Sequence, residues 1–366
     1  MTDSISFAKL IDKDVDWLDY LAQEKLALDS SGNPVGDGMT LQFSFYDGGV
    51  LPFYVNNQKY PQVEGSSLAG AAGEINTLQE SLIRFFLLPQ ASGYRVSFSD
   101  VSNLKFSESE GLGEIHITNL NIVKPTALGG ALQVDPDATG YDTWNQTWAG
   151  DIFLDTDGSV DNVSSHANVN QRQTGLAQKG YHVILHELAH AIGLQHSDRS
   201  IDGEYSSLKY TIMIPSISKS MGYLHPEMGI TTFNNVKQYV FAQGLQLLDI
   251  AAIQSIYGRN YATRGVTDET DPNSGNTVYG LGQGFANEST PFIYTIWDGG
   301  GLHDSISGAG YLSGVQIDLR QGHFSSIVRQ PLFWSPGSSG TIPRLIFTHF
   351  LDHLPRENPA SVGIAG

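Results

Sequence analysis

The sequence predicts an α+β fold, in which a mixed, twisted sheet packs with long helices and is followed by a small β-rich, Gly-rich domain. Three observations support this fold class. The chain of 366 residues is long enough for two domains. Between residues 38 and 262, short apolar runs alternate with two segments of helical period. Beyond about residue 263, Gly, Ser, Thr and Asn surround the apolar runs. We therefore expect an N-terminal segment (1–37), an α+β domain (38–262) and a β-rich C-terminal domain (263–366).

The elements of the first part follow from its breaker residues and its hydrophobic period. Residues 1–28 mix aspartates with apolar positions, which favours a short surface helix, and residues 29–34 predict a loop. Residues 69–88 predict a helix that ends before Pro89. Its apolar residues at helical spacing include Ile75, Leu78, Leu82, Phe85 and Phe86. Strands are expected at Leu41–Phe45, Val96, Lys105, Ile115–Ile117, Ala131–Val134 and Ile152–Leu154.

Composition excludes several classes of partner and of site. A net charge of −18 would repel nucleic acid and anionic membrane surfaces, although it would not repel calcium. The chain has no cysteine, which excludes disulfides and thiolate metal ligands. No apolar run is long enough to predict a membrane span, and the N-terminus lacks the basic and apolar regions of a signal peptide. We expect a monomer.

The most informative motif is HELAHAIGLQH, residues 186–196. His186 and His190 are one helical turn apart, so both imidazoles leave the same face of a helix and can bind one zinc ion. Gly193 can adopt a left-handed conformation that ends the helix and returns the chain, which makes His196 a third ligand. Three neutral nitrogens leave a fourth position for water, and Glu187 is placed to take its proton as general base.

Histidines on a helix are more often surface or core residues than ligands, and His-Glu-x-x-His occurs by chance in long chains. The longer pattern is more specific, because the histidines, the glutamate and the glycine all agree with one geometry. A catalytic zinc site is therefore favoured over a decayed or structural one.

At this point the chain resembles the metzincin clan of zinc endopeptidases, whose extended motif has this form. That clan has a methionine turn beneath the zinc, and the resemblance implies that Met213, in the segment TIMIPS (211–216), packs under the histidines without binding metal. A plain core methionine is the alternative.

Within the clan, some residues resemble one family, the matrixins, and other segments resemble another, the serralysins. Ser197 and Pro215 are similar to matrixins, and the tyrosine with which serralysins can bind zinc is missing. The segment 247–258 closely resembles the helix that closes the serralysin catalytic domain. Residues 276–280 and 297–301 are similar to the start of the serralysin C-terminal region. The chain is thus most similar to serralysins, which implies secretion through a C-terminal signal.

The same resemblance implies a substrate cleft. An edge strand would pair antiparallel with an extended peptide, and a second segment would form the opposite wall. Protein or peptide substrates are the expected partners, and a proteinaceous inhibitor is a further one. An interior strand is the alternative for the first segment. The edge strand would comprise Ala131, Leu132, Gln133 and Val134, and the wall Pro215, Ser216 and Ile217.

Two segments are candidate calcium sites. Asp151, Asp155, Asp157 and Asp161 place oxygen ligands around a glycine, although a solvated acidic turn explains the pattern equally well. Residues 299–307 match the calcium nonapeptide of serralysins except at Leu302, and His303 resembles an insertion. By local alignment with that family, the ligands of this second site would be Asp298, Gly300 and Asp304, with Gly275 and Thr277 as carbonyl donors.

A serralysin would continue into tandem nonapeptides that stack into a calcium-bound β-roll. The sequence contains no such array, and either a longer natural protein or a trimmed form would explain this. The predicted function is hydrolysis of internal peptide bonds by a zinc-activated water. A secreted binding or adhesion module with little turnover and a zinc aminopeptidase are the alternatives.

Overall fold

The chain forms two compact units in a computed structural model. The first unit comprises Met1–Leu88 and Leu104–His196, and the second comprises Pro89–Asn103 and Ser197–Gly366. The structure describes residues 27–28, 34–35, 40–46, 67–68, 74–89, 97–111, 113–120, 122–123, 129–131, 150–155, 179–197, 208, 210–214, 231–233, 236–238, 242, 244–260, 277–281, 284–285, 292–298, 303–310, 315–318, 324–328, 343–351 and 363–365.

The first unit contains a mixed sheet in the order β5-β3-β6-β9-β8 among its described strands. Strand β3 (Thr40–Phe45) pairs in parallel with β5 (Lys105–Glu108) and with β6 (Ile115–Leu120), and β6 pairs in parallel with β9 (Ile152–Asp155). Strand β8 (Gly129–Ala131) closes this order antiparallel to β9. The predicted mixed sheet is confirmed, and its strands at 41–45, 105, 115–117 and 152–154 lie where the sequence predicts them.

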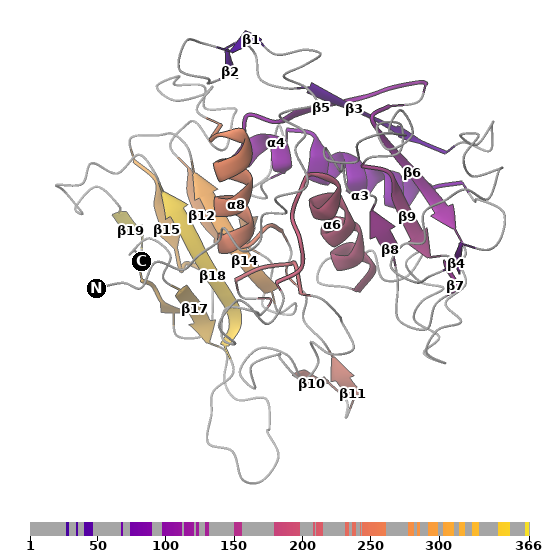
Figure 1. Cartoon of the computed structure of the whole chain (residues 1–366). Helices are drawn as coiled ribbons and strands as arrows, with labels where there is room; N and C mark the ends of the chain where they lie inside the picture. The colour runs from indigo at the N-terminus through magenta and orange to yellow at the C-terminus, as the bar shows by residue number, and fades with distance from the viewer. Residues whose placement is uncertain are drawn as a thin grey trace. The chain divides into compact units, whose positions relative to one another are not determined.

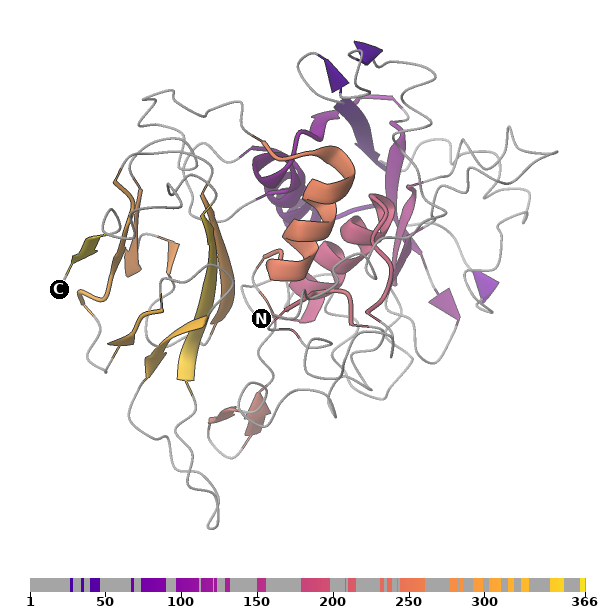
Figure 2. The ribbon, with the colours of Figure 1, turned by 60° about the vertical axis from the view of Figure 1, so that its left-hand side comes forward.

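Two helices pack with this sheet. Helix α6 (Lys179–Ala191) contacts β8, β9 and α3 (Thr77–Leu87), and Figures 1 and 2 show both helices on the same side of the sheet. The rings of Phe86 and Tyr181 meet edge to face with centroids 4.8 Å apart. The buried apolar residues of this unit include Leu41, Phe43, Ile83, Phe86, Leu87, Phe106, Ile115, Ile117, Phe153, Tyr181, Ile184 and Leu188.

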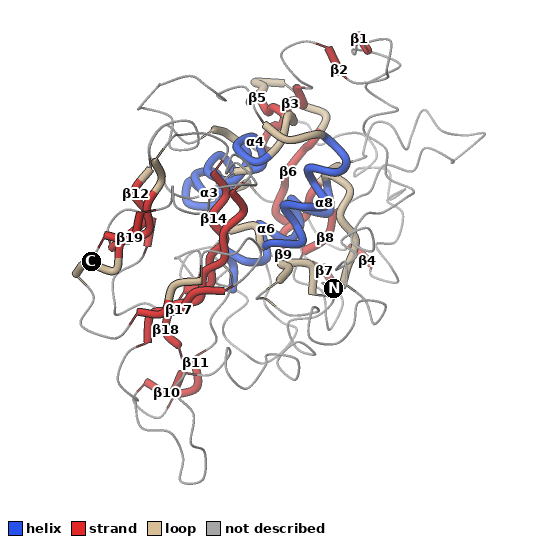
Figure 3. Tube along the Cα trace, turned by 90° about the vertical axis from the view of Figure 1, so that its left-hand side faces the viewer, coloured by secondary structure: helices blue, strands red, loops and turns tan. Residues whose placement is uncertain are grey.

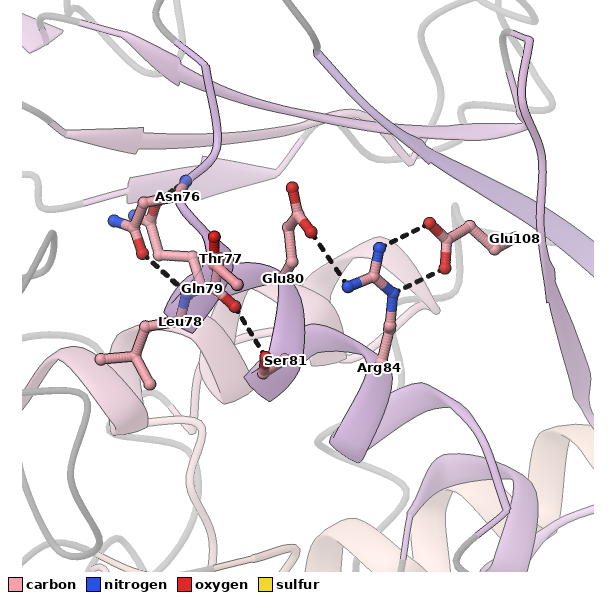
Figure 4. Close-up of polar contacts among 8 residues, drawn as sticks. All are labelled: Asn76, Thr77, Leu78, Gln79, Glu80, Ser81, Arg84 and Glu108. Carbon is pink, nitrogen blue, oxygen red and sulfur yellow. Dashed lines mark hydrogen bonds and ion pairs between the residues drawn. The ribbon is translucent and has the colours of Figure 1, made fainter.

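The prediction of a helix over 69–88 is wrong about its start. Residues 74–76 are not helical, and α3 begins at Thr77 because Asn76 caps it: the Asn76 side chain accepts the amides of Leu78 and Gln79. In turn, the Asn76 amide donates to the side-chain oxygen of Gln79 at 3.0 Å, which completes a capping box (Figure 4).

The buried face of α3 also differs from the apolar residues that the sequence singles out. Leu78 is 45% exposed, and the buried positions are Gln79, Ile83, Phe86 and Leu87. The polar Gln79 is buried because its amide exchanges two hydrogen bonds, of 3.1 and 3.0 Å, with the amide of Asn119 at the end of β6. On the exposed face, Arg84 donates two bonds of 2.7 Å to the Glu108 carboxylate and so links α3 to β5 (Figure 4).

The described helices of the second unit are α4 (Phe98–Val101) and α8 (Leu247–Tyr257). Helix α8 is buried on almost all sides, and the Gln254 side chain donates a 2.9 Å bond to the Val101 carbonyl of α4. It ends at Gly258, whose φ of 77° lies in the left-handed region that favours glycine. The sequence-predicted helix over 247–258 is confirmed.

The C-terminal strands of the second unit form two sheets in separate layers (Figure 2). The first has the order β13-β12-β15-β19, with all neighbours parallel, and the second has the order β14-β18-β17-β16. Figure 3 shows β14, β17 and β18 running together, apart from β12 and β19. The strands are β12 (Val278–Leu281), β13 (Gly284–Phe285), β14 (Phe292–Asp298), β15 (Ser305–Ser307), β16 (Val315–Gln316), β17 (Phe324–Val328), β18 (Pro343–Leu351) and β19 (Gly363–Ala365).

Three antiparallel pairs of short strands complete the described elements: β1 (Ala27–Leu28) with β2 (Pro34–Val35), β4 (Ser67–Leu68) with β7 (Ile122–Val123), and β10 (Thr231–Phe233) with β11 (Val236–Gln238). The predicted helix within 1–28 and the strand at Val96 lie outside the described residues, apart from β1. No helix in the described part of the chain has both the length and the apolar character needed to cross a bilayer.

Gly113 lies where the chain enters β6, against the backbone of β3. A Cβ at this position would come within 2.5 Å of the Gln42 carbonyl oxygen and 2.8 Å of the Phe43 Cα. Because backbone cannot move aside without disturbing the sheet, we expect Gly113→Ala to lower the free energy of unfolding by about 1–3 kcal/mol in urea titrations. Gly111→Ala is the matched control, since its Cβ would meet only the Ser109 hydroxyl at 3.8 Å. Equal stability of the two variants would contradict this packing.

Candidate metal centre

Helix α6 places two of the three predicted histidines. His186 is buried and His190, one turn later, is half-buried, with the ring centroids 4.7 Å apart. The helix ends at Ala191, and the chain reverses at Gly193, whose φ is 100°. The Gly193 amide donates to the His190 carbonyl and the Leu194 amide to the Ala189 carbonyl, which is the bond pair of a Schellman motif. This reversal returns His196 to the helix.

The three side chains converge on one point. The Nε2 atom of the exposed His196 lies 3.1 Å from Nε2 of His186 and 3.1 Å from Nε2 of His190. One ligand atom from each residue lies within 4.8 Å of the others. Nitrogens 2.0–2.1 Å from a tetrahedral zinc ion are about 3.3 Å apart, so these spacings fit the three corners of such a site. The residues present therefore fit a zinc ion.

The surroundings of His190 fix which nitrogen faces that point. Its Nδ1 lies 2.6 Å from the Leu194 carbonyl oxygen, which can only accept, so Nδ1 carries the proton and Nε2 keeps its lone pair. Burial and the neighbouring His196 lower the pKa of His190 to about 3. The ring is thus neutral at pH 7, the form that binds metal. The sequence does not predict that Leu194 accepts a bond from His190, because the acceptor is a backbone carbonyl, which every residue has.

Glu187 follows His186 on α6 and is only 7% exposed. In sequence it stands directly beside the first predicted zinc ligand, where a carboxylate could exchange protons with a metal-bound water. Its role as general base stays a prediction.

Sequence reasoning overlooked His182, one turn before His186 on the same helix face. Its side chain is 2% exposed, and its ring centroid lies 5.8 Å from that of His186. Burial lowers the pKa of His182 to about 4, so it is a neutral packing neighbour of the first predicted ligand at pH 7. The spacing 182–186–190 was the signal that could have found it.

The predicted methionine turn is a buried segment of the second unit. Met213 is 0% exposed; its amide donates to the Thr211 hydroxyl, and its carbonyl accepts the Ser197 amide at 2.6 Å. The packing of Met213 under the histidines stays a prediction.

Asp249, which sequence reasoning also overlooked as a site residue, anchors this turn. It is 0% exposed, and its carboxylate accepts the Thr211 hydroxyl at 2.6 Å, the Ile212 amide at 2.9 Å and the Gln246 amide at 2.8 Å. Burial raises the pKa of Asp249 to about 7, while the bonds from Thr211, Gln246 and Ile212 lower it. Its position three residues after the residue that precedes α8 was the signal available in the sequence.

The substrate-cleft residues are only partly within the described chain. Gly129–Ala131 form β8, the last strand of the sheet order on the β9 side among the described strands. Pairing of this edge with a substrate stays a prediction. Leu132, Gln133, Val134, Pro215, Ser216 and Ile217 lie outside the described residues.

The candidate calcium ligands that the structure describes make protein hydrogen bonds. In the first cluster, Asp151 is 1% exposed and accepts the His116 amide at 3.0 Å, whereas Asp155 is described only as part of β9. In the second, the structure brings Asp304 to Thr277, whose amide it accepts at 2.9 Å, and Asp298 accepts the Tyr279 hydroxyl at 2.8 Å. Calcium binding stays a prediction at both places. Asp157, Asp161, Gly275 and Gly300 lie outside the described residues.

Comparison with known proteins finds relatives that are all named as metalloproteases or serralysins. No protein-family model matches the chain. Metallopeptidase AprA of Pseudomonas marginalis is 28% identical over 250 residues, 65% of this chain and 47% of that protein. Serralysin B of Dickeya chrysanthemi is 27% identical over 242 residues, 63% and 45% of the two chains. Metalloprotease AprA of Pseudomonas entomophila is 26% identical over 292 residues, 77% and 53%. The chain spans about half the length of the curated relatives it matches.

The mixed α/β fold and the three-histidine cluster are compatible with the catalytic domain of a metzincin metalloprotease. The serralysin resemblance found in the sequence is confirmed by these relatives, whereas the matrixin-like details at Ser197 and Pro215 stay a prediction.

The raised pKa of Asp249 predicts how the free energy of unfolding depends on pH. Because its folded pKa is raised to about 7 from about 4 in the unfolded chain, the folded state binds the extra proton, and stability falls as pH rises between these values. Urea unfolding of the metal-free protein and of Asp249→Asn should show the wild-type advantage shrinking from pH 4 to pH 7 and then levelling. An advantage that grows over this range would contradict the raised pKa.

Proposed function

We propose that the chain is the catalytic part of a secreted zinc-dependent metalloendopeptidase that hydrolyses internal peptide bonds of proteins. The observation that carries the proposal is the convergence of His186, His190 and His196 within 3.1 Å contacts, in a chain whose relatives are named as metalloproteases and serralysins. The reversal at Gly193 and the bond from His190 to the Leu194 carbonyl support it, because both orient nitrogens toward one ion.

The three histidines would hold zinc through Nε2, and bound zinc would supply Lewis acidity to the scissile carbonyl and to the attacking water. Glu187 would accept the proton of that water and pass it to the leaving amine. Its place next to His186 on α6 and its low exposure of 7% support this role. The serralysin tyrosine is absent from the sequence, so backbone donors would assist in stabilising the oxyanion.

Substrate would bind as an extended strand along β8 and residues 131–134, opposite the wall at 215–217. The edge position of β8 among the described strands supports this, because an unpaired strand offers amides and carbonyls to any peptide backbone. Recognition through backbone implies broad specificity. The resemblance to serralysins further supports export from the cell, structural calcium, a monomeric state and inhibition by a protein inhibitor.

The decisive variant is Glu187→Gln. We expect kcat/KM on a quenched peptide with blocked ends to fall roughly 100- to 10,000-fold, because the water loses its proton acceptor. Zinc content and melting temperature should stay at wild-type values, because no predicted ligand changes. Glu110→Gln, which removes the same charge from an exposed position, is the control and should keep full activity. Full activity in Glu187→Gln would refute the base assignment.

The wild-type protein should contain zinc near one per chain and cleave casein, and o-phenanthroline should abolish cleavage. Cleavage of an end-blocked peptide separates an endopeptidase from an aminopeptidase. Stoichiometric zinc without any cleavage would favour the alternative of a binding module on a metzincin scaffold.

Structural calcium gives a separate test in the C-terminal sheets. Removing calcium would leave buried carboxylates such as Asp298 and Asp304 with less opposing charge. We therefore expect EGTA to lower the melting temperature before zinc is lost, as followed by calorimetry and by metal analysis. An unchanged melting curve would count against calcium at these positions.

A further inference from the structure

We propose that Asp249 is a positioning residue for the third histidine of the metal centre, acting through Thr211, Met213 and Ser197. The inference rests on the proposed function, because it assigns His196 to the metal. None of these four residues is a predicted ligand, and Asp249 lies 53 positions after His196 in the chain.

The first step is the attachment of the turn to α8. The Asp249 carboxylate accepts the Thr211 hydroxyl and the Ile212 amide at 2.6 and 2.9 Å. Beside it, the Leu248 amide donates to the Tyr210 carbonyl at 2.9 Å. Residues 210–212 are thus bound at three atoms to the first turn of one helix. The Gln246 amide, just before that turn, also donates to the carboxylate at 2.8 Å.

The second step runs through the hydroxyl of Thr211. While its proton goes to Asp249, its oxygen accepts the Met213 amide at 2.9 Å. A hydroxyl that donates and accepts at once is fixed in rotation, and each bond polarises the other. Asp249 therefore sets the orientation of the peptide that enters Met213, although the two residues share no direct bond among those described.

The third step reaches the metal centre. The Met213 carbonyl accepts the Ser197 amide at 2.6 Å. This N–H belongs to the planar peptide that joins Ser197 to His196, so its direction fixes the ψ angle of His196. His196 is the exposed member of the three histidines and lies beyond the end of α6, so it has no helical backbone to orient it. The bond to Met213 supplies that restraint.

Burial makes this chain of bonds costly to break. Asp249, Thr211 and Met213 are each 0% exposed, and Ser197 is 1% exposed. A donor or acceptor that loses its partner there cannot turn to water instead.

The test is the rate of zinc release from the full chain at pH 7.5, measured with excess pyridylazoresorcinol as chelator. Thr211→Val keeps the shape of the side chain but removes the hydroxyl, and Asp249→Asn removes the carboxylate. We expect both to release zinc roughly 10- to 100-fold faster than the wild type, the range typical of residues that orient metal ligands. Thr211→Ser restores the hydroxyl and should restore the wild-type rate.

Asp100→Asn is the matched control. Asp100 is also a buried acid three residues into a helix start, where it accepts the Ser97 amide at 2.8 Å, but it has no described bond to the turn at 211–213. If Asp249→Asn acted only by destabilising the fold, Asp100→Asn would accelerate zinc release to the same extent, and that outcome would overturn the proposal. Wild-type release rates in folded Thr211→Val would overturn it as well.

Hydrogen exchange gives a readout that does not depend on zinc. In metal-free protein, Thr211→Val should raise the exchange rate of the Ser197 amide, whereas Asp100→Asn and Thr211→Ser should not. If the wild type takes up no zinc, the proposed function fails at that step, before any variant is compared. If the wild type binds zinc and cleaves peptide but Ser197 exchange is unchanged in Thr211→Val, the inference alone fails.

Discussion

The reversal of the chain at Gly193 is the constraint on which the metal centre depends. A helix can place two imidazoles on one face, but its rise of about 1.5 Å per residue carries any third one away along the axis. The left-handed φ of 100° at Gly193 ends α6 and brings His196 back within 3.1 Å of both helical histidines. A residue with a Cβ would be strained at this angle. The same reversal exposes the Leu194 carbonyl that selects the tautomer of His190.

Buried aspartates are the second recurring feature of the described residues. Asp100, Asp151, Asp249, Asp298 and Asp304 are each less than 9% exposed, and each accepts a protein hydrogen bond. Part of the acidic excess of the chain is therefore not surface charge but a set of acceptors for amides and hydroxyls in loops and at helix starts. Because Asp151, Asp298 and Asp304 each already accept a protein donor, calcium binding at these residues stays a prediction.

The site and its relatives agree at the level of chemistry. Three histidine nitrogens that fit one zinc ion are compatible with a metalloprotease, and the relatives are named as metalloproteases and serralysins. The match covers about half of the length of these relatives, so the comparison says nothing about the other half of those proteins. The sequence lacks the tyrosine with which serralysins can bind zinc, and Pro215 stands at the matching position.

The sequence by itself determined the elements whose signals are local. The period of apolar residues located β3, β6 and β9, and the resemblance of residues 247–258 to a serralysin helix located α8. The spacing of His186, His190 and Gly193 predicted the three-histidine cluster, because ligand spacing on a helix is set by its pitch. The start of α3 was misplaced because apolar residues before Asn76 continue the helical pattern, whereas the capping box at Asn76 and Gln79 begins the helix later. Only the tertiary structure decided the partners of Gln79, the burial of His182 and the bonds of Asp249 to Thr211 and Ile212. Those contacts join residues 37 or more positions apart or depend on which face is covered, and no local pattern of side chains encodes them.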